Sequence, residues 1–132
     1  MFRRIVILSL VLAFILAVAG GGLSAESEEE AKLHYEQGKK YYLAGDMDKA
    51  EEELNEAIRL DENQLNAYAL LGALYKGQGK VNKAITLYKV ALEIAPNFFY
   101  GHKNLGDLYY EEGEMDKALE EYKRAAELKP NY

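Results

Sequence analysis

The chain contains no cysteine and no tryptophan, and only two of its 132 residues are proline. Without cysteine it can form neither a disulfide framework nor a zinc site with thiolate ligands. Residues 31–132 also contain no serine and a single threonine, Thr86. The hydroxyl and thiol nucleophiles of covalent catalysis are therefore almost absent. The composition predicts a protein that is not an enzyme and that uses no metal ion and no cofactor.

Long apolar runs are absent except at the N-terminus. Met1 to Arg4 carry two positive charges, and Ile5 to Ala19 form an apolar run that only Ser9 interrupts. A basic start, an apolar stretch and an exit of small residues are the layout of a secretory signal peptide. Residues 17–19 (Ala-Val-Ala) supply a cleavage site, and residues 23–25 (Leu-Ser-Ala) a poorer one. We therefore interpret residues 1–25 as a signal peptide or an uncleaved signal anchor.

The anchor alternative depends on residues 5–23, which barely reach the roughly 17–25 residues that a membrane-spanning helix needs. Either alternative leaves Arg3 and Arg4 inside and the acidic leader of residues 26–30 outside. The expected location is extracytoplasmic: periplasmic or secreted if the signal is cleaved, and anchored with the repeats outside if it is not. Membrane contact is expected only through residues 5–23.

The rest of the chain repeats with a period of 34 residues. Shifting residues 65–98 onto 99–132 brings identical residues into register, namely Leu71 with Leu105, Gly72 with Gly106, Tyr75 with Tyr109, Gly79 with Gly113, Ala84 with Ala118, Tyr88 with Tyr122, Ala91 with Ala125 and Pro96 with Pro130. Residues 31–64 form a weaker third copy, in which Gly38, Tyr41, Gly45, Ala50, Leu54 and Ala57 fall on the same places. The two histidines, His34 and His102, occupy one repeat position and are expected to pack rather than to bind a ligand. A fixed period of this length is typical of stacked-repeat proteins.

Each copy is expected to form two helices. In the second copy, Leu65, Tyr68, Leu71 and Tyr75 follow helical spacing. A glycine then stands where a helix end needs a left-handed residue, at Gly45, Gly79 and Gly113. Three residues later come the predicted N-caps of the second helix, at Asp48, Asn82 and Asp116. The second helix should end before Pro96 and Pro130, because proline cannot continue a helix.

Two further local predictions concern the glycines and the acidic leader. Ser27 to Glu30 match a capping box, so the first helix is expected to begin at Ser27. Glycine inside a helix costs about 1 kcal/mol relative to alanine, so a glycine that recurs mid-helix needs a structural reason. We expect the mid-helix glycines to allow close contact with alanines of the following helix; the pairs are Gly38 with Ala50, Gly72 with Ala84, and Gly106 with Ala118.

This pattern resembles the tetratricopeptide repeat family over residues 31–132. The resemblance implies an all-α fold, a right-handed superhelical stack of three helix-turn-helix repeats at 31–64, 65–98 and 99–132. It also implies a concave groove, lined by the first helix of each repeat, that binds proteins or peptides. The groove positions that the resemblance assigns are Lys32, Tyr35, Lys39, Tyr42, Asn66, Ala69, Ala73, Lys76, Tyr100, Lys103, Asp107 and Tyr110, with Leu43, Gly77 and Glu111 beside them.

Tyrosine is enriched at binding hot spots, and four of the groove positions are tyrosines. With four lysines, they suggest a peptide that carries acidic groups or a C-terminal carboxylate. The alternative is that these tyrosines and lysines are ordinary solvent-exposed surface. The clamp by which some family members hold a terminal carboxylate is missing, because Tyr35, Lys39, Leu70, Tyr100 and Asn104 stand at its places. The net charge of −6 argues against nucleic acid as a partner.

A second surface is expected at the end of the third repeat. Such arrays often end in a polar capping helix, and Leu119, Tyr122, Ala126 and Leu128 would line the end that lacks one. The sequence therefore leaves two functions open. The favoured one is an extracytoplasmic adaptor that binds a peptide or protein segment in its groove. The alternative is a self-associating component of a larger envelope complex, a homo-oligomer that docks through this end.

Overall fold

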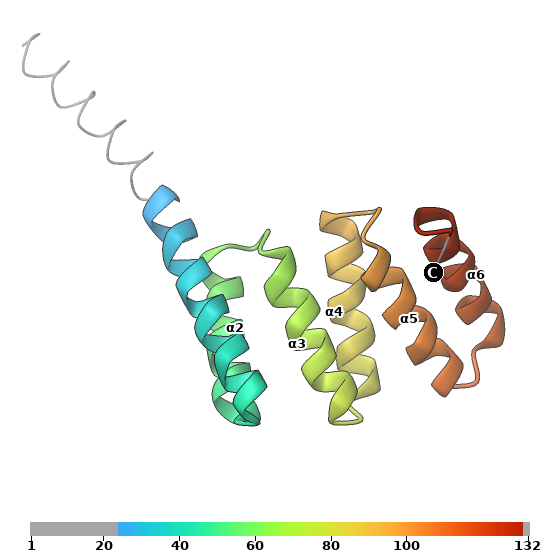
Figure 1. Ribbon diagram of the computed structural model, residues 1–132, viewed down its shortest axis with the longest axis horizontal. Helices are drawn as coiled ribbons and strands as arrows, with labels where there is room; N and C mark the ends of the chain where they lie inside the picture. Colours follow the sequence, from blue (N-terminus) through green and yellow to red (C-terminus); the bar gives the residue numbers. More distant parts are fainter. Residues whose placement is uncertain (1–23, 131–132) are drawn as a thin grey trace, which may run out of the picture.

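The computed structural model describes residues 24–130, which form helices and no strand. The first helix covers residues 24–44 and is followed by α2 (Met47–Leu60), α3 (Leu65–Gly77), α4 (Val81–Ile94), α5 (Phe99–Glu111) and α6 (Met115–Leu128). Each helix from α2 onward packs against the next one in the chain, and the hairpins stand side by side in one row (Figure 1). The predicted all-α stack of three helical hairpins is confirmed.

Most of the predicted signal segment, residues 1–23, lies outside the described residues. Within residues 24–130, no helix is both long enough and apolar enough to cross a bilayer. The structure does correct the predicted start of the first helix, because residues 24–30 are already helical. Ser27 lies inside that helix, and its hydroxyl donates to the Ser24 carbonyl at 2.8 Å instead of capping a helix end.

Glycines close the first helix of every hairpin, as predicted. Gly45, Gly79 and Gly113 have φ angles of +82°, +72° and +79°, which residues with a side chain rarely adopt. After each glycine, the next backbone N–H donates to a carbonyl five residues back. These bonds are Asp46 N to Tyr41 O at 2.9 Å, Lys80 N to Tyr75 O at 2.9 Å and Glu114 N to Tyr109 O at 2.8 Å. The pattern is a Schellman turn, which satisfies carbonyls at the helix end.

The predicted N-caps of the second helices are wrong by two residues. The caps are Asp46, Lys80 and Glu114, and only Asp46 bonds a backbone N–H through its side chain, that of Lys49 at 3.3 Å. The Schellman turn leads directly into the next helix, so the residue after the glycine becomes the cap. The predicted caps Asp48, Asn82 and Asp116 lie in the first helical turn instead.

The ends of the second helices agree with the proline rule. α4 ends at Ile94 and α6 at Leu128, each two residues before a proline. In the first repeat, which has no proline there, α2 ends at Leu60 and Asp61 turns the chain into an extended conformation. The Asp61 carboxylate accepts a hydrogen bond from the Asn63 N–H at 2.9 Å and holds that turn.

The mid-helix glycines do not face alanines, contrary to the prediction. A Cβ on Gly72 would lie 3.1 Å from the ring of Tyr88, and one on Gly106 would lie 2.8 Å from the ring of Tyr122. Gly38 faces Leu54 in the same way, at 2.9 Å. Each glycine therefore makes room for a large side chain on the second helix of its own hairpin.

The core consists of leucines and tyrosines separated by alanines. Its largest fully buried side chains are those of Tyr88, Leu54, Leu71, Leu74, Leu105 and Leu108. Burying a side chain of this size stabilises a fold by about 1.5–3 kcal/mol. The repeat alanines Ala50, Ala57, Ala84 and Ala91 are wholly buried and let the helices approach closely. The hairpins are thus joined into one continuous core.

Two buried tyrosines, Tyr75 and Tyr88, and the partly buried Tyr122 make stability sensitive to alkaline pH. Burial and a hydrogen bond to Glu51 raise the pKa of Tyr75 to about 12. Burial and a hydrogen bond to Asp107 raise the pKa of Tyr122 to about 12, and burial raises the pKa of Tyr88 further. In the unfolded chain these phenols ionise near pH 10. The contribution of these tyrosines to the free energy of unfolding is complete below pH 10. It is lost as the pH rises towards 12, because the phenols of the unfolded chain release their protons at a lower pH than those of the folded protein.

We therefore expect the tyrosine contribution to the free energy of unfolding, measured with urea, to be constant from about pH 8 to 10. Above pH 10 the free energy of unfolding should fall steeply. Tyr122→Phe should make that fall shallower, because it removes one of the titrating groups. An unfolding free energy that stays level to about pH 11.5 would contradict the burial of these phenols.

Candidate functional site

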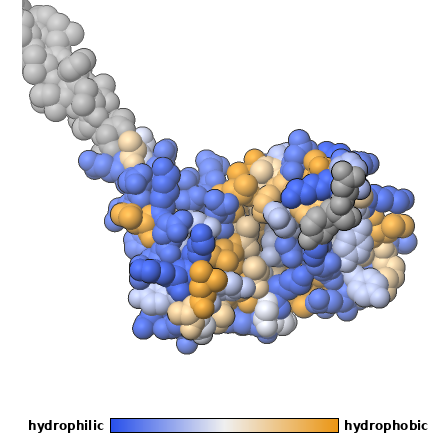
Figure 2. Space-filling view, in the orientation of Figure 1, coloured by the Kyte–Doolittle hydropathy of each residue, from blue (hydrophilic) through white to orange (hydrophobic). Residues whose placement is uncertain are grey.

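A groove crosses the middle of the stack. It has a volume of ≈ 430 Å³ and is lined by Tyr35, Asn66, Ala69, Leu70, Ala73, Tyr88, Phe98, Tyr100 and Asn104. On the face shown in Figure 2, hydrophobic surface gathers around the middle of the molecule and hydrophilic surface flanks it. The groove is lined by the small side chains of Ala69 and Ala73 from α3, here called its floor, and by aromatic rings. This is a typical composition for a binding groove.

The groove brings together five of the predicted positions: Tyr35, Asn66, Ala69, Ala73 and Tyr100. It does not include Lys32, Lys39, Tyr42, Lys76, Lys103, Asp107 or Tyr110 in its lining. Tyr110 is 59% exposed and Tyr42 is half-buried against the core.

Four lining residues were not among the predicted positions: Leu70, Tyr88, Phe98 and Asn104. Leu70 and Asn104 occupy the same position in successive repeats and directly follow predicted positions, so the repeat register contained a signal for them. Tyr88 belongs to the second helix of its repeat and Phe98 precedes α5, so the groove positions expected on the first helices included neither.

Tyr100 is held in place although it is half exposed. Its ring centroid lies 5.1 Å from that of Phe99 and 6.1 Å from that of Phe98, both edge to face. Lys129 Nζ lies 4.8 Å from the centroid of the Tyr100 ring. Such aromatic and cation–π contacts contribute about 0.5–1.5 kcal/mol each. The ring therefore enters binding already ordered, which lowers the entropic cost of association.

A polar cluster adjoins the groove, with Asp107 at its centre. Asp107 Oδ2 accepts from Lys76 Nζ and Lys103 Nζ, both at 3.0 Å, and Oδ1 accepts from the Tyr122 hydroxyl at 2.7 Å. Burial alone would raise the pKa of Asp107, but these three hydrogen bonds outweigh burial and hold the pKa below its usual range. Asp107 is therefore ionised at neutral pH, and the two lysines exceed it by one positive charge.

Asn104 connects this cluster to the groove. It lines the groove, its Oδ1 accepts from Lys76 Nζ at 3.4 Å, and its Nδ2 donates to the Tyr100 carbonyl at 2.8 Å. The other two lysines at predicted groove positions also have carboxylate partners, since Lys32 lies 3.4 Å from Glu29 and Lys39 lies 4.0 Å from Glu36. The local positive charge is therefore smaller than four lysines alone would give.

At the predicted docking end, the four residues lie in different environments. Leu119 is 53% exposed, Ala126 is exposed and Leu128 is half-buried. Tyr122 is partly buried, because its ring packs on Gly106 and its hydroxyl is bonded to Asp107. Together with Ala126 it lines a hollow of ≈ 210 Å³.

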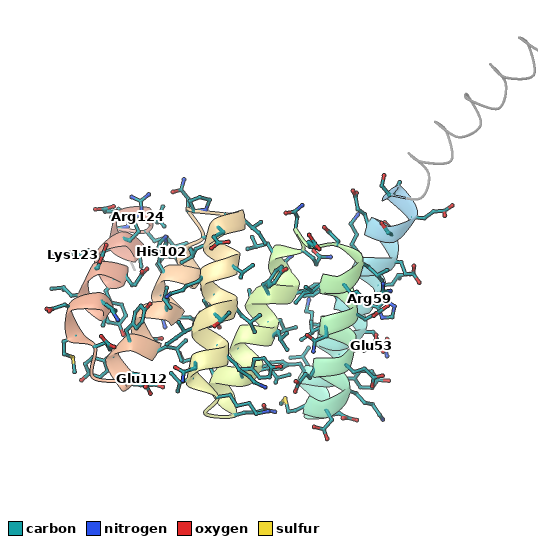
Figure 3. All side chains as sticks on the ribbon, turned by 180° about the vertical axis from the view of Figure 1, so that it is seen from behind. Glu53, Arg59, His102, Glu112, Lys123 and Arg124 are labelled. Atoms are coloured by element: carbon teal, nitrogen blue, oxygen red, sulfur yellow. The ribbon has the colours of Figure 1, made fainter. Side chains whose placement is uncertain are left out.

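The two histidines join helices within their repeats. His34 Nδ1 lies 2.5 Å from Glu53 Oε2, and His102 Nδ1 lies 2.6 Å from Glu121 Oε2. Figure 3 shows His102 near Lys123 and Arg124. These three residues, with Glu120, Glu121 and Glu127, line a hollow of ≈ 440 Å³. Another hollow, of ≈ 530 Å³, includes Arg59, which is itself paired with Glu56. Among residues 24–130, no group of three side chains is arranged to hold a metal ion.

The fold and the groove define a helical-hairpin repeat protein. The family model for the TPR repeat matches residues 38–79 and 77–113, and that for the tetratricopeptide repeat matches residues 99–132. The chain therefore belongs to the tetratricopeptide repeat family. No curated protein matches the sequence.

Solved structures give the same fold. A crystal structure of MamA is 29% identical with a TM-score of 0.74; the match covers 76% of this chain but 59% of that one. The first TPR of Spaghetti (RPAP3), bound to the HSP90 peptide SRMEEVD, has a TM-score of 0.77 at 20% identity, covering 80% of this chain and 83% of that one. The Arabidopsis OM64 TPR domain has a TM-score of 0.77 at 19% identity, covering 80% and 88%.

Proposed function

We propose that the protein is an extracytoplasmic interaction module that holds an extended peptide or protein segment in its groove and performs no chemistry. The observation that carries this proposal is the groove itself, whose lining combines the aromatic rings of Tyr35 and Tyr100 with the small side chains of Ala69 and Ala73. Small floor residues let a ligand backbone come close, and ordered aromatic rings supply contact area at low entropic cost. The RPAP3 structure, which holds a peptide, supports the same use of this fold.

The extracytoplasmic part of the proposal rests on the sequence of residues 1–25 alone. A fusion of alkaline phosphatase to the C-terminus tests it, because that enzyme is active only where its disulfides can form. We expect activity from the fusion and none when residues 1–25 are deleted. Equal activity with and without the segment would contradict the proposal.

Affinity capture tests the binding function. The bait is the full chain in mild detergent, and the matched control carries Tyr35→Ala and Tyr100→Ala. Both rings are at least partly exposed, so we expect the control to keep its helicity. A protein captured by the first bait and lost from the control would support the groove as the binding site. Equal capture by both baits would place the binding surface elsewhere.

A second candidate function, self-association, is favoured by the outer face of α6. Met115 and Leu119 are 54% and 53% exposed, and Ala126 is exposed as well. The equivalent residues of α4, Val81, Ile85 and Leu92, are packed against the core. α6 therefore presents an apolar stripe whose counterpart on α4 is packed against the core.

The first repeat would not cover this stripe in a head-to-tail stack. Leu71 and Leu74 of α3 are buried, but Gln37 and Lys40 stand at the same positions in the first helix. Burying Lys40 without a partner would be costly. Association would instead bring two α6 faces together around a twofold axis, which closes at a dimer.

Mass measurement at several concentrations tests the dimer. For the full chain we expect a mass that rises with concentration, and for Leu119→Glu the mass of one chain at every concentration, because the new carboxylates would be desolvated in the contact. Lys89→Glu, which changes charge on the exposed surface of α4 and not on α6, serves as the control. A wild-type mass that does not change with concentration would contradict this candidate.

A further inference from the structure

We infer that the groove selects an internal peptide segment in which one bulky apolar side chain is followed closely by an acidic residue. The inference rests on the proposed peptide-binding function and adds the chemistry of the ligand. It follows from two neighbouring features, the apolar groove and the lysine pair at Asp107, which Asn104 joins.

The groove is suited to an apolar side chain. Tyr35, Leu70, Phe98 and Tyr100 surround a floor of alanines, and the polar side chains in the lining are the amides of Asn66 and Asn104 and the tyrosine hydroxyls. Its volume of ≈ 430 Å³ has room for one large side chain with adjoining backbone. Burial of such a side chain would supply the main part of the binding free energy.

The lysine pair is suited to one acidic group beside that side chain. Lys76 and Lys103 share the single oxygen Oδ2 of Asp107, and their side chains are 25% and 35% exposed. An ammonium group has three N–H donors. Lys76 uses two of them, on Asp107 and Asn104, and Lys103 uses one on Asp107. Donors and one net positive charge therefore remain for a ligand carboxylate, in a partly desolvated place where the attraction is stronger than in water.

A C-terminal carboxylate does not fit inside the groove. The nearby positions Tyr35, Leu70 and Tyr100 bring rings and an aliphatic chain into the lining, and no cation is among the lining residues. A carboxylate buried there would lose its hydration without gaining a charged partner. The acidic group of the ligand therefore has to lie on the lysine pair, outside the apolar part of the groove.

Selection from a display library of random 12-residue peptides, with the full chain as target, tests the composition. We expect the selected peptides to share a Leu, Met, Phe or Ile followed within about three residues by Asp or Glu. Amidation of their C-termini should leave affinity unchanged. If no peptide is selected, the proposed function fails. If peptides are selected without this pair, or if amidation abolishes binding, the proposed function stands and this inference is overturned.

Asp107→Asn provides the sharper test. Asparagine keeps the acceptor for the Tyr122 hydroxyl and removes the carboxylate that competes with the ligand. We expect a selected peptide to bind roughly fivefold more tightly to this variant, and the gain to disappear for the same peptide with its acid changed to an amide. Unchanged or weaker binding by a folded variant would overturn the inference.

Lys103→Gln decides the question if Asp107→Asn lowers stability. It should weaken the acidic peptide roughly fivefold and leave the amide peptide unaffected, whereas Lys89→Gln, on the exposed surface of α4, should change neither. Equal effects of Lys103→Gln on both peptides would show that Lys103 does not bind the acidic side chain of the peptide, and the inference would be wrong.

Discussion

Replacing Gly72 with leucine should unfold the middle of the stack. A Cβ at this position would lie 3.1 Å from Cε2 and Cζ of Tyr88, a ring that is only 1% exposed. The ring cannot move outward without opening the core between α3 and α4. Extra methylenes in a packed core cost about 1–3 kcal/mol, and leucine adds several at once. We expect a loss of most of the unfolding free energy, which is about 5–15 kcal/mol for small domains.

Gly77 in the same helix is the matched control. A Cβ there meets nothing within 4 Å, and its φ angle is not positive. Gly77→Ala should therefore stabilise the protein by up to about 1 kcal/mol through helix propensity, whereas Gly72→Ala should destabilise it. Urea unfolding followed by circular dichroism measures both. A Gly72→Leu protein with wild-type helicity and midpoint would refute the close packing of Gly72 on Tyr88.

Replacing Ala73 with leucine should abolish ligand binding and leave the fold intact. Ala73 forms part of the groove floor and is only half-buried, so the added side chain would fill the space that a ligand side chain needs. Leucine is a good helix former, so α3 should keep its stability. We expect at least a hundredfold loss of affinity, because the ligand would forfeit the burial of one large apolar side chain, about 1.5–3 kcal/mol, and its backbone would clash as well.

Ala44→Leu makes the same substitution at an exposed position near the end of the first helix, outside the groove lining. It should leave affinity within about twofold of wild type. Fluorescence anisotropy with a selected peptide measures both variants, and circular dichroism checks their folding. Full binding by a folded Ala73→Leu protein would show that the ligand does not enter the groove.

The period of 34 residues was sufficient to predict the fold. Glycines that adopt positive φ and prolines that stop a helix act locally, so the helix ends at Gly79 and Pro96 could be predicted from the sequence alone. The N-caps were missed because the Schellman turn at Gly79 shortens the connection, which is a property of the turn as a whole. The partner of Gly72 was also missed, because which side chain of α4 lies opposite depends on the crossing of two helices.

The site could be predicted only in part, for the same reason. The resemblance to the tetratricopeptide repeat family placed Tyr35, Ala73 and Tyr100 together, because it assigns set positions of each first helix to one groove. It could not show that Asp107 would neutralise a large part of the charge of Lys76 and Lys103, because those contacts depend on side-chain conformations. Nor could it show that Tyr122 would turn inward onto Gly106.

Site-specific photocrosslinking in the host shows whether partners bind in the groove. A benzophenone side chain would replace Tyr100 in the groove, Leu119 on the outer face of α6, or Lys89 on the exposed surface of α4. We expect a crosslinked partner from position 100 and none from position 89, with any product from position 119 being the dimer. A partner crosslinked from position 89 or 119, and absent at position 100, would contradict binding in the groove.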